Sequence, residues 1–503
     1  MPDSGPGGQS RRQIRVGIAV AAVFWLMLAL AGFPRAYPDD AIMIGPALGL
    51  RDHGFLDNVF LSRAFYPEPA YLFYPPTFSW ALLGWISLFG QSLKALALFW
   101  AACCIAASIA LGTLISRLGR ISWGIPAACV LLLGCVAYSG IRMEILGFAT
   151  FFWGVMLTSN GRAHWRGPGY FLLFVTPTIA PTFLAFCLVA SLALFVRRIS
   201  ARELVLAGGG LALACLVLIL ACQGDVGGLA RTMYKYSSIR VGIGGRGDFL
   251  QNLVRVLGLG VIMTAAICLV RIKALGEKVM SAHVMVPVLL TTGFALSVAT
   301  HSRPSIWIAY TLGQLFLLAL TGQALLKHAQ AIGAGWASLA RLATWPVMPI
   351  GLLVFLAAFN GHYAARYAPV PLSPGLTAIA RTAVEGAPAA DMVFADAAVF
   401  GALDFPTARP MRDAMVVNPW PDYLQDFKAI PKGQTWVLSL SNFLALSQNG
   451  GGRVAQTPRL ARYLVAPGGA RVDAEQVCVL RADASVVIAQ DIDAAVRRYC
   501  RAG

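Results

Sequence analysis

The chain has 503 residues, of which 58% are hydrophobic and only 13% are charged, and its mean hydropathy is +0.68. A soluble domain typically carries about 25% charged residues, so the composition excludes an ordinary soluble globular protein. The formal net charge is +17. In a soluble protein this excess would suggest a nucleic-acid partner. Here Lys and Arg lie in short loops between apolar blocks, as expected beside anionic lipid, and no nucleic-acid partner is predicted.

The first apolar stretch, VGIAVAAVFWLMLALAGF, occupies residues 16–33 without a charge. About 20 residues at ~1.5 Å each span the hydrocarbon core of a bilayer, so this stretch is a candidate transmembrane helix. Arg11, Arg12 and Arg15 precede it, as basic residues precede a secretory signal. The stretch is long for a signal core, and no small-x-small cleavage site is obvious. We therefore predict a cytoplasmic tail over 1–15 and a retained membrane anchor.

Further apolar blocks follow at intervals that suit a polytopic α-helical membrane protein with about 10–13 transmembrane helices. The block at 169–196 contains Pro177 and Pro181. Proline removes a backbone donor and breaks helices, which predicts two short passes or a re-entrant pair. The predicted membrane domain covers 16–360. Its later blocks lie at 77–90, 94–116, 121–138, 145–159, 169–196, 203–222, 253–271, 281–300, 305–326 and 344–360.

Short basic segments set the predicted orientation, because cytoplasmic loops carry an excess of Lys and Arg. If these basic segments, including 117–120, lie in the cytoplasm, residues 77–116 must cross the bilayer an odd number of times. The same residues nevertheless divide naturally into two apolar blocks around 91–94. Either 77–90 lies along the membrane surface or 117–120 is an exception. The segments placed inside are 117–120, 161–166, 196–202, 271–278 and 327–341, which leaves the first loop 34–76, the segments 139–144, 223–252 and 301–304, and the C-terminal tail extracytoplasmic.

The tail, residues 361–503, alternates short β-type runs with helical stretches, which predicts a small extracytoplasmic α/β domain. Its two cysteines, Cys478 and Cys500, could form a disulfide outside the cytoplasm or remain separate thiols. No catalytic constellation is visible in the tail, and acceptor positioning or a structural cap is expected of it. The strand-like runs are 392–397, 435–441, 477–482 and 485–490, and the helical stretches are 422–430 and 491–500.

The densest polar cluster follows the first apolar stretch, where Asp39 and Asp40 stand in the window 33–58. A carboxylate at the boundary between water and lipid suits a general base, because an apolar neighbourhood raises its pKa toward a useful range. The alternative is that the two aspartates only cap the helix that follows, since Asp is a favoured N-cap.

A second window, 65–90, holds Glu68, several aromatic residues and Pro75-Pro76 at the start of an apolar helix. Aromatic side chains are common anchors at membrane boundaries, and proline is common in the first turn of a helix. These structural roles explain the aromatics and prolines but leave Glu68 unexplained.

Together the two windows resemble the C-type glycosyltransferase superfamily, and most closely its protein O-mannosyltransferases and lipid A aminoarabinose transferases. YPDD at 37–40 matches the acidic pair of the first extracytoplasmic loop in these families. Tyr74-Pro75-Pro76-Thr77, followed by Trp80 and LFG at 88–90, matches the proline-rich opening of their next helix. Tyr74 stands where the families carry a lysine, so another residue would have to contact the carrier phosphate.

The resemblance implies an enzyme of the bacterial inner membrane that moves a sugar from a polyprenyl-phosphate carrier to a cell-envelope acceptor at the periplasmic face. The acceptor would be a lipid, a glycan or a protein. By the same resemblance Asp39 is the general base, and Asp40 is its orienting partner or a metal contact. A divalent metal, Mg²⁺ or Mn²⁺, is left open, with Glu68 as the candidate ligand because hard cations prefer carboxylate oxygens.

Several cationic positions are candidates for binding the carrier phosphate, since arginine forks suit phosphate groups. Arg142 and Glu144 are either a snorkelling surface pair or part of a phosphate site. The loop 223–252 is either an ordinary flexible loop or a mobile phosphate-binding loop. His301 and Arg303 lie at a membrane edge, where a capped loop residue is the alternative. The basic residues of the loop are Arg231, Lys235, Arg240 and Arg246.

Two other functions compete with glycosyl transfer. A lipid or glycan transporter or flippase predicts inverted repeats and charged residues at mid-membrane, and neither is visible in the sequence. A glycan polymerase or ligase is expected to place its long functional loop late in the membrane region, whereas the acidic window here lies in the first loop.

Overall fold

The computed structural model describes the N-terminal half of the chain and parts of the C-terminal domain. Asp39, Glu68, Tyr74, Arg246, His301 and Arg303 lie outside the described residues, and of Lys235 and Arg240 only the helical backbone is described. The described ranges are 7–34, 40–61, 70–72, 75–119, 124–136, 140–196, 198–243, isolated positions between 265 and 288, 372–406, 411–413, 432–440, 443, 476–481 and 492–502.

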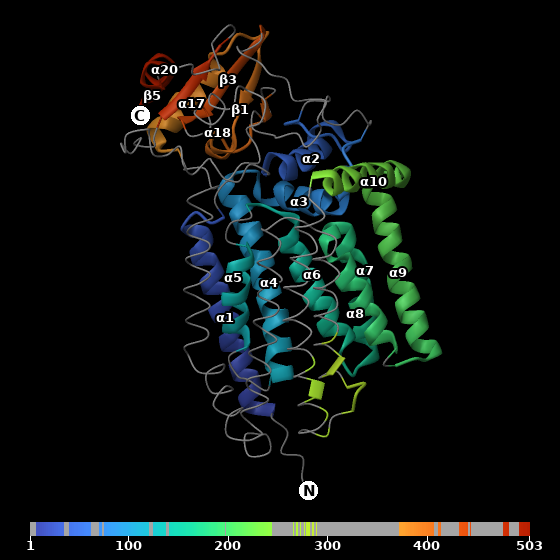
Figure 1. Cartoon of the computed structure of the whole chain (residues 1–503). Coiled ribbons are helices and arrows are strands. Elements are labelled where there is room, and N and C mark those ends of the chain that lie inside the picture. Colours follow the sequence, from blue (N-terminus) through green and yellow to red (C-terminus); the bar gives the residue numbers. More distant parts are fainter. Residues whose placement is uncertain are drawn as a thin grey trace.

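Long helices run side by side as a bundle, and the C-terminal domain lies beyond one end of it (Figure 1). Three further helices, α2 (Asp40–His53), α3 (Pro76–Phe89) and α10 (Val226–Ile243), lie at this same end of the bundle. The bundle helices are α1 (Gly7–Leu30), α4 (Leu93–Gly119), α5 (Gly124–Val136), α6 (Met143–Thr158), α7 (Ala163–Ile179), α8 (Leu184–Val196) and α9 (Ala201–Ala221), with the 3₁₀ turn η2 (Pro181–Phe183) before α8.

Three of the described helices are long and apolar enough to cross a bilayer, over Gln13–Leu30, Leu93–Ser116 and Ala201–Ala221. The protein is therefore an integral membrane protein. The predicted total of about 10–13 spans includes the blocks at 281–300, 305–326 and 344–360, nearly all of which lies outside the described residues, so that total stays a prediction.

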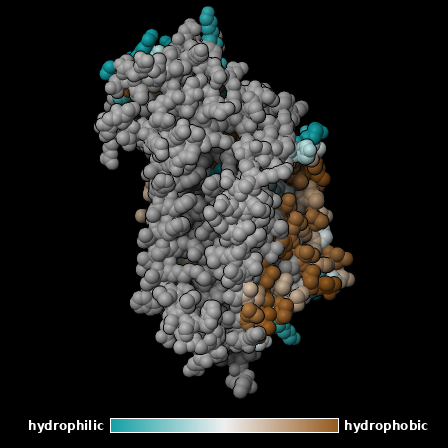
Figure 2. Space-filling model, viewed as in Figure 1, coloured by the Kyte–Doolittle hydropathy of each residue, from teal (hydrophilic) through white to brown (hydrophobic). Residues whose placement is uncertain are grey.

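The exposed face of α9 has the composition of a lipid-facing surface. Leu204, Val205 and Leu220 are 62%, 72% and 64% exposed, an arrangement that a soluble protein rarely tolerates over a whole helix. Figure 2 shows apolar side chains covering the side of the molecule where α9 lies in Figure 1.

The proline-containing block at 169–196 forms two helices, as predicted. Helix α7 ends at Ile179, Pro181 opens the short turn η2, and α8 continues from Leu184. Because proline lacks the amide proton that a helix interior needs, the break falls at the second proline. Pro177 is accommodated within the last turn of α7.

The uncertainty over residues 77–116 is resolved by α3 (Pro76–Phe89), which does not cross the bundle. At the start of α3, the indole of Trp80 donates to the carbonyl of Ala221 at 3.1 Å, at the end of α9. Just after its end, Gln91 donates to the carbonyl of Phe405 at 2.9 Å, in the C-terminal domain. Both contacts belong to the end of the bundle that carries α2, so α4 alone crosses and residues 117–120 need no exception.

Two of the basic segments predicted to be cytoplasmic, 161–166 and 196–202, lie at the opposite end of the bundle. Arg198 donates to the carbonyl of Asn160 at 2.8 Å. Glu203, which is 1% exposed, accepts from the Tyr170 hydroxyl at 3.0 Å and lies 3.4 Å from Arg166. The segments 161–166 and 196–202 therefore share one end of α6, and residues 140–142 lie at the other.

In the part of the C-terminal domain that the structure describes, five strands form one sheet in the order β2-β1-β3-β4-β5. Strand β1 pairs parallel to β2 and to β3, while β4 pairs antiparallel to β3 and to β5. The elements are α17 (Pro374–Glu385), β1 (Met392–Ala395), α18 (Ala397–Ala402), β2 (Met411–Asp413), β3 (Gln434–Ser439), β4 (Gln476–Leu480), α20 (Ile492–Tyr499) and β5 (Cys500–Ala502).

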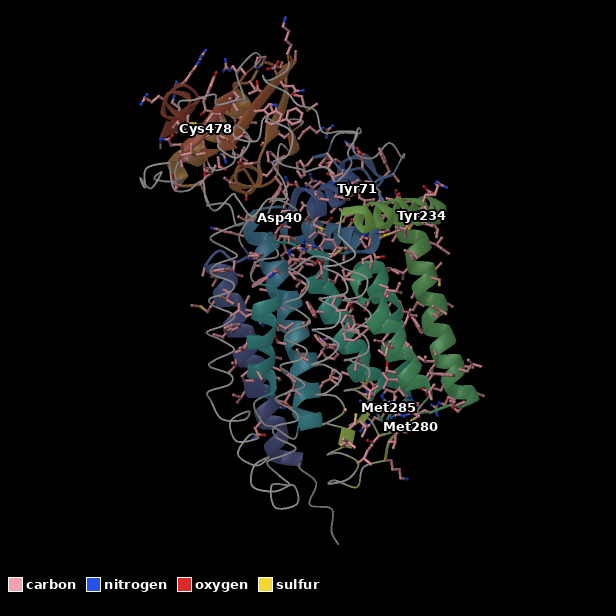
Figure 3. The ribbon with its side chains drawn as sticks, viewed as in Figure 1. Asp40, Tyr71, Tyr234, Met280, Met285 and Cys478 are labelled. Atoms are coloured by element: carbon pink, nitrogen blue, oxygen red, sulfur yellow. A yellow bond between two sulfur atoms is a disulfide. The ribbon has the colours of Figure 1, made fainter. Side chains whose placement is uncertain are left out.

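This domain confirms the predicted α/β character and joins its two cysteines. Strands β1, β3 and β4 and helix α20 fall where the pattern placed them, whereas the three-residue strands β2 and β5 were not predicted. The stretches 422–430 and 485–490 lie outside the described residues. Cys478 on β4 stands opposite Cys500 on β5 and forms a disulfide with it (Figure 3).

Candidate functional site

Asp40 is the first residue of α2 (Asp40–His53) and is only 1% exposed. Its Oδ1 accepts a hydrogen bond from the backbone N–H of Ile141 at 2.9 Å, 101 positions further along the chain. The carboxylate therefore does more than begin its own helix, because it also ties the first loop to the segment before α6. Figure 3 shows Asp40 at the end of the bundle that carries α10 and the C-terminal domain.

Arg142 directly follows Ile141 and is the N-cap residue of α6. Its Nε and Nη2 donate to the two carboxylate oxygens of Glu144 at 3.1 and 3.0 Å. The side chains of Arg142 and Glu144 are only 17% and 18% exposed, so they form a largely buried fork and not a snorkelling surface pair. Glu144 lies in the first turn of α6, where the helix dipole stabilises a negative charge.

The site thus brings together two of the predicted groups. Asp40 from the first loop is bonded to Ile141, and the Arg142–Glu144 pair follows directly at the start of α6. A guanidinium offers five N–H donors in a fixed fork, and the pair with Glu144 orients that fork. The placement of Asp39 next to Asp40 follows from the sequence alone.

The helix that carries Asp40 contains a proline, and the first loop compensates for it. Pro46 lacks an N–H, so the carbonyl of Ile42 loses its helical partner. The side chain of Asn58, 1% exposed, donates to that carbonyl at 3.2 Å. Its Oδ1 in turn accepts from the N–H of Phe60 at 3.1 Å. The loop after α2 is therefore fastened back onto the middle of the helix.

Two glycines of α2 make this close approach possible. A Cβ added to Gly45 would lie 2.0 Å from Oδ1 of Asn58, and one added to Gly49 would lie 1.8 Å from the carbonyl oxygen of Asp57. The glycines are four positions apart and so share one face of the helix. Only residues without a side chain fit between α2 and its own loop.

The prediction of a loop over 223–252, either an ordinary flexible loop or a phosphate-binding one, is wrong for residues 226–243, which form the helix α10 (Val226–Ile243). Its first turns pack on an apolar cluster: Leu229 contacts the group that includes Leu50, Leu56 and Leu72. Arg231 is 73% exposed and lies 3.9 Å from Asp225, a surface pair of little strength. The sequence missed the helix because its glycines and basic residues resemble those of a loop.

The junction of α9 and α10 is joined to the first loop by Gln223. Its Oε1 accepts from the N–H of Leu56 at 3.1 Å, and its Nε2 donates to the carbonyl of Gly54 at 3.0 Å. Burial and the nearby carboxylate of Asp225 raise the pKa of Cys222 to about 11, so this thiol stays protonated at neutral pH. The two bonds from Gln223 to the first loop place the start of α10 at the same end of the bundle as Asp40.

The described residues do not by themselves form a metal centre. Among them, no group of three or more His, Cys, Asp or Glu side chains is placed to hold a metal ion. The predicted ligand Glu68 lies outside the described ranges, as does Asp39. A divalent metal thus stays a prediction that rests on the sequence.

No family model matches the chain, and no curated protein matches it. Solved structures that are similar in fold include the oligosaccharyltransferase of Archaeoglobus fulgidus tethered to an acceptor peptide that contains an NVT sequon. That structure is 12% identical, covers 91% of this chain and 73% of the other, and has a TM-score of 0.44. The apo form of the same protein is 13% identical with a TM-score of 0.45, over 93% of this chain and 76% of the other.

Two further structures of this archaeal protein hold ligands, one an inhibitory peptide with a dolichol-phosphate and the other Zn and sulfate. The first of these is 12% identical, with a TM-score of 0.43, and covers 94% of this chain and 76% of the other. All of these neighbours are oligosaccharyltransferase structures. The likeness is too distant to transfer an activity, so the function has to be derived from the residues of the chain itself.

Proposed function

We propose that the protein is a membrane glycosyltransferase that moves a sugar from a polyprenyl-phosphate carrier to an acceptor outside the cytoplasm. The observation that carries the proposal is the hydrogen bond from Ile141 to Asp40, which holds the second residue of the acidic pair against the segment that leads into Arg142. Glycosyl transfer needs a base for the acceptor and positive charge for the departing phosphate. These two requirements meet at one end of the bundle.

In the proposed reaction Asp39 takes the proton of an acceptor hydroxyl, and the freed oxygen attacks the anomeric carbon of the sugar. The bond between that carbon and the phosphate oxygen breaks, and its electron pair leaves with the carrier phosphate. Arg142, oriented by Glu144, stabilises the charge on the phosphate. Asp40, which follows Asp39 in the sequence, would hold the segment that carries Arg142 through its bond to Ile141.

Further contacts to the donor are proposed from the remaining cationic positions. Arg231 and the later basic residues of α10 would attract the carrier phosphate, since this helix lies at the same end of the bundle as Asp40. If a divalent metal takes part, Glu68 is the proposed ligand. The other proposed contacts are Tyr74, Lys235, Arg240, Arg246, His301 and Arg303, as in the sequence-based prediction.

The side of the membrane is inferred from the C-terminal domain. Disulfides persist in oxidising compartments, and Cys478 is bonded to Cys500. The same domain touches the first loop, because Arg412 donates to the carbonyl of Val59. We therefore infer that the site faces the periplasm of a bacterial inner membrane, while the basic end of the bundle faces the cytoplasm.

The test is transfer from a defined polyprenyl-phosphate sugar to extracted membrane acceptors by the purified protein in lipid. Asp39→Asn should abolish turnover and retain binding of the carrier, because the amide cannot accept the proton. Asp57→Asn is the matched control, since Asp57 is also in the first loop but pairs with His53 at 3.1 Å. Unchanged transfer by Asp39→Asn would contradict the proposal. Movement of labelled carrier lipid across liposomes without transfer would instead indicate a flippase.

A further inference from the structure

One side chain, Gln91, connects the C-terminal domain to the helix that carries Asp40. It lies in the turn between α3 and α4. Its Nε2 donates to the carbonyl of Phe405 at 2.9 Å and approaches that of Asp404 at 3.4 Å. Its Oε1 accepts from Nη1 of Arg51, in the last turn of α2. An amide side chain can both donate and accept, so Gln91 serves both partners at once.

The C-terminal domain contacts the bundle through Asp404 and Phe405, which we call the seat of the domain, and the backbone conformation of both residues is unusual. Asp404 and Phe405 have φ values of 57° and 53°, a left-handed conformation that non-glycine residues rarely adopt. Such a conformation persists where the surroundings enforce it. Here Asp404 Oδ1 accepts from the N–H of Leu93 at 2.9 Å, and Phe405, 1% exposed, packs 6.1 Å from the ring of Phe60.

Helix α2 links this seat to the candidate site. Arg51 stands in its last turn and Asp40 at its first position, about 17 Å apart along a helix of ~1.5 Å per residue. The proline in the middle does not leave the two halves loose, since Asn58 supplies the missing hydrogen bond to Ile42. Next to Asn58, Arg412 of the C-terminal domain donates to the carbonyl of Val59. The domain therefore holds α2 at its far end and, through the loop, at its middle.

We propose that Gln91 is a positioning residue, which couples the seating of the C-terminal domain to the placement of Asp40 and of the Ile141–Arg142 segment. This inference rests on the proposed function, because it concerns how the C-terminal domain regulates the proposed glycosyltransferase site. An acceptor that shifts the C-terminal domain would act on the acidic pair through Gln91, Arg51 and α2. The enzyme would then reach full turnover only with the domain seated.

The test measures amide hydrogen exchange at Ile141 in the full-length protein in lipid nanodiscs, which needs neither donor nor acceptor. Gln91→Leu removes both hydrogen bonds, and we expect exchange at Ile141 to rise about tenfold, as for the loss of one coupled hydrogen bond. Gln91→Glu keeps an acceptor for Arg51 but cannot donate to Phe405, so it should also raise the exchange, by a smaller factor. It serves as the second variant if Gln91→Leu does not fold.

The matched control is Ser92→Ala, which alters the neighbouring residue. The Ser92 hydroxyl accepts from the N–H of Ala95 at 3.2 Å, within the start of α4, and exchange at Ile141 should not change. Faster exchange at 400–406 with unchanged exchange at Ile141 would overturn the inference, because Gln91 would then only hold the domain in place. Wild-type turnover by Gln91→Leu would overturn it too.

The two hypotheses fail separately. If Asp39→Asn transfers sugar normally, the proposed function is wrong, yet the effect of Gln91→Leu on exchange at Ile141 still reports the coupling. If Asp39→Asn is inactive and Gln91→Leu changes neither exchange nor the turnover number, the function stands and the coupling does not. A lower turnover number with an unchanged KM for the acceptor is the kinetic result that a positioning role predicts.

Discussion

The side-chain amide of Asn58 donates to the carbonyl oxygen of Ile42, the group that Pro46 leaves without a helical partner. A buried carbonyl without a partner costs about 1–3 kcal/mol, so this bond stabilises α2 at its proline. It also fastens the first loop to the helix that begins with Asp40. A sequence pattern cannot show this pairing, because it joins residues 16 positions apart across a turn.

Asn58→Leu should therefore destabilise the protein by about 1–3 kcal/mol, since the carbonyl of Ile42 stays buried and loses its donor. Thermal unfolding in detergent, followed by tryptophan fluorescence, measures the loss. Pro46→Ala in the same background should recover part of it, because alanine restores the helical N–H for Ile42. A Pro46→Ala change that gives no recovery would show that the missing hydrogen bond is not the cause.

The disulfide gives a prediction about both stability and compartment. Cys478→Ser with Cys500→Ser should destabilise the C-terminal domain by about 2–4 kcal/mol, the usual range for such a bond. We infer that the bond lies outside the cytoplasm, so in intact cells a membrane-impermeant maleimide should label Cys478 only after an impermeant reductant is added. Labelling without reductant would contradict the disulfide. Labelling that requires permeabilised cells would place the domain, and with it the site, inside.

Cys222 gives a pH-dependent prediction. Burial and Asp225 raise its pKa to about 11 from 9.0, so folding favours the protonated thiol. The stabilisation from this shift is present below pH 9.0 and is lost as the pH rises through about 11. At pH 8 the thiolate is therefore rarer than in the unfolded chain, and alkylation of Cys222 should be slower in the folded protein. Equal rates before and after denaturation, in a variant whose other free cysteines are serine, would contradict this.

The sequence predicts the elements whose signal is local and leaves out those that depend on contacts. The apolar blocks, the break before Pro181 and the strands at 392–397, 435–441 and 477–482 are visible because their periodicity or breakers lie within a few residues. Strand β5 is not, since the three residues Cys500–Ala502 extend a sheet edge only when β4 is already in place.

For the candidate site, too, the sequence predicts individual residues but not the contacts between them. The acidic pair and Arg142 can be singled out as polar groups at membrane edges, but the bond from Ile141 to Asp40 joins segments that only the folded bundle brings together. The placement of α3 along one end was also open, because a mostly apolar helix of 14 residues suits a surface helix as well as a short span. Helix α10 was hidden by its glycines, which lower helix propensity without preventing a helix that packs on Leu50 and Leu56.

Single-turnover transfer from a polyprenyl-phosphate sugar by Arg142→Gln tests the central claim most directly. This change keeps a polar side chain but removes the charge proposed to stabilise the departing phosphate. The rate should fall by about 10²–10³, the usual loss for one such group, with the KM for the acceptor unchanged. Arg231→Gln, which alters an exposed arginine at the same end of the bundle, should weaken donor binding only and leave the rate at saturating donor intact. Transfer by Arg142→Gln at the wild-type rate would contradict the assignment of this site to glycosyl transfer.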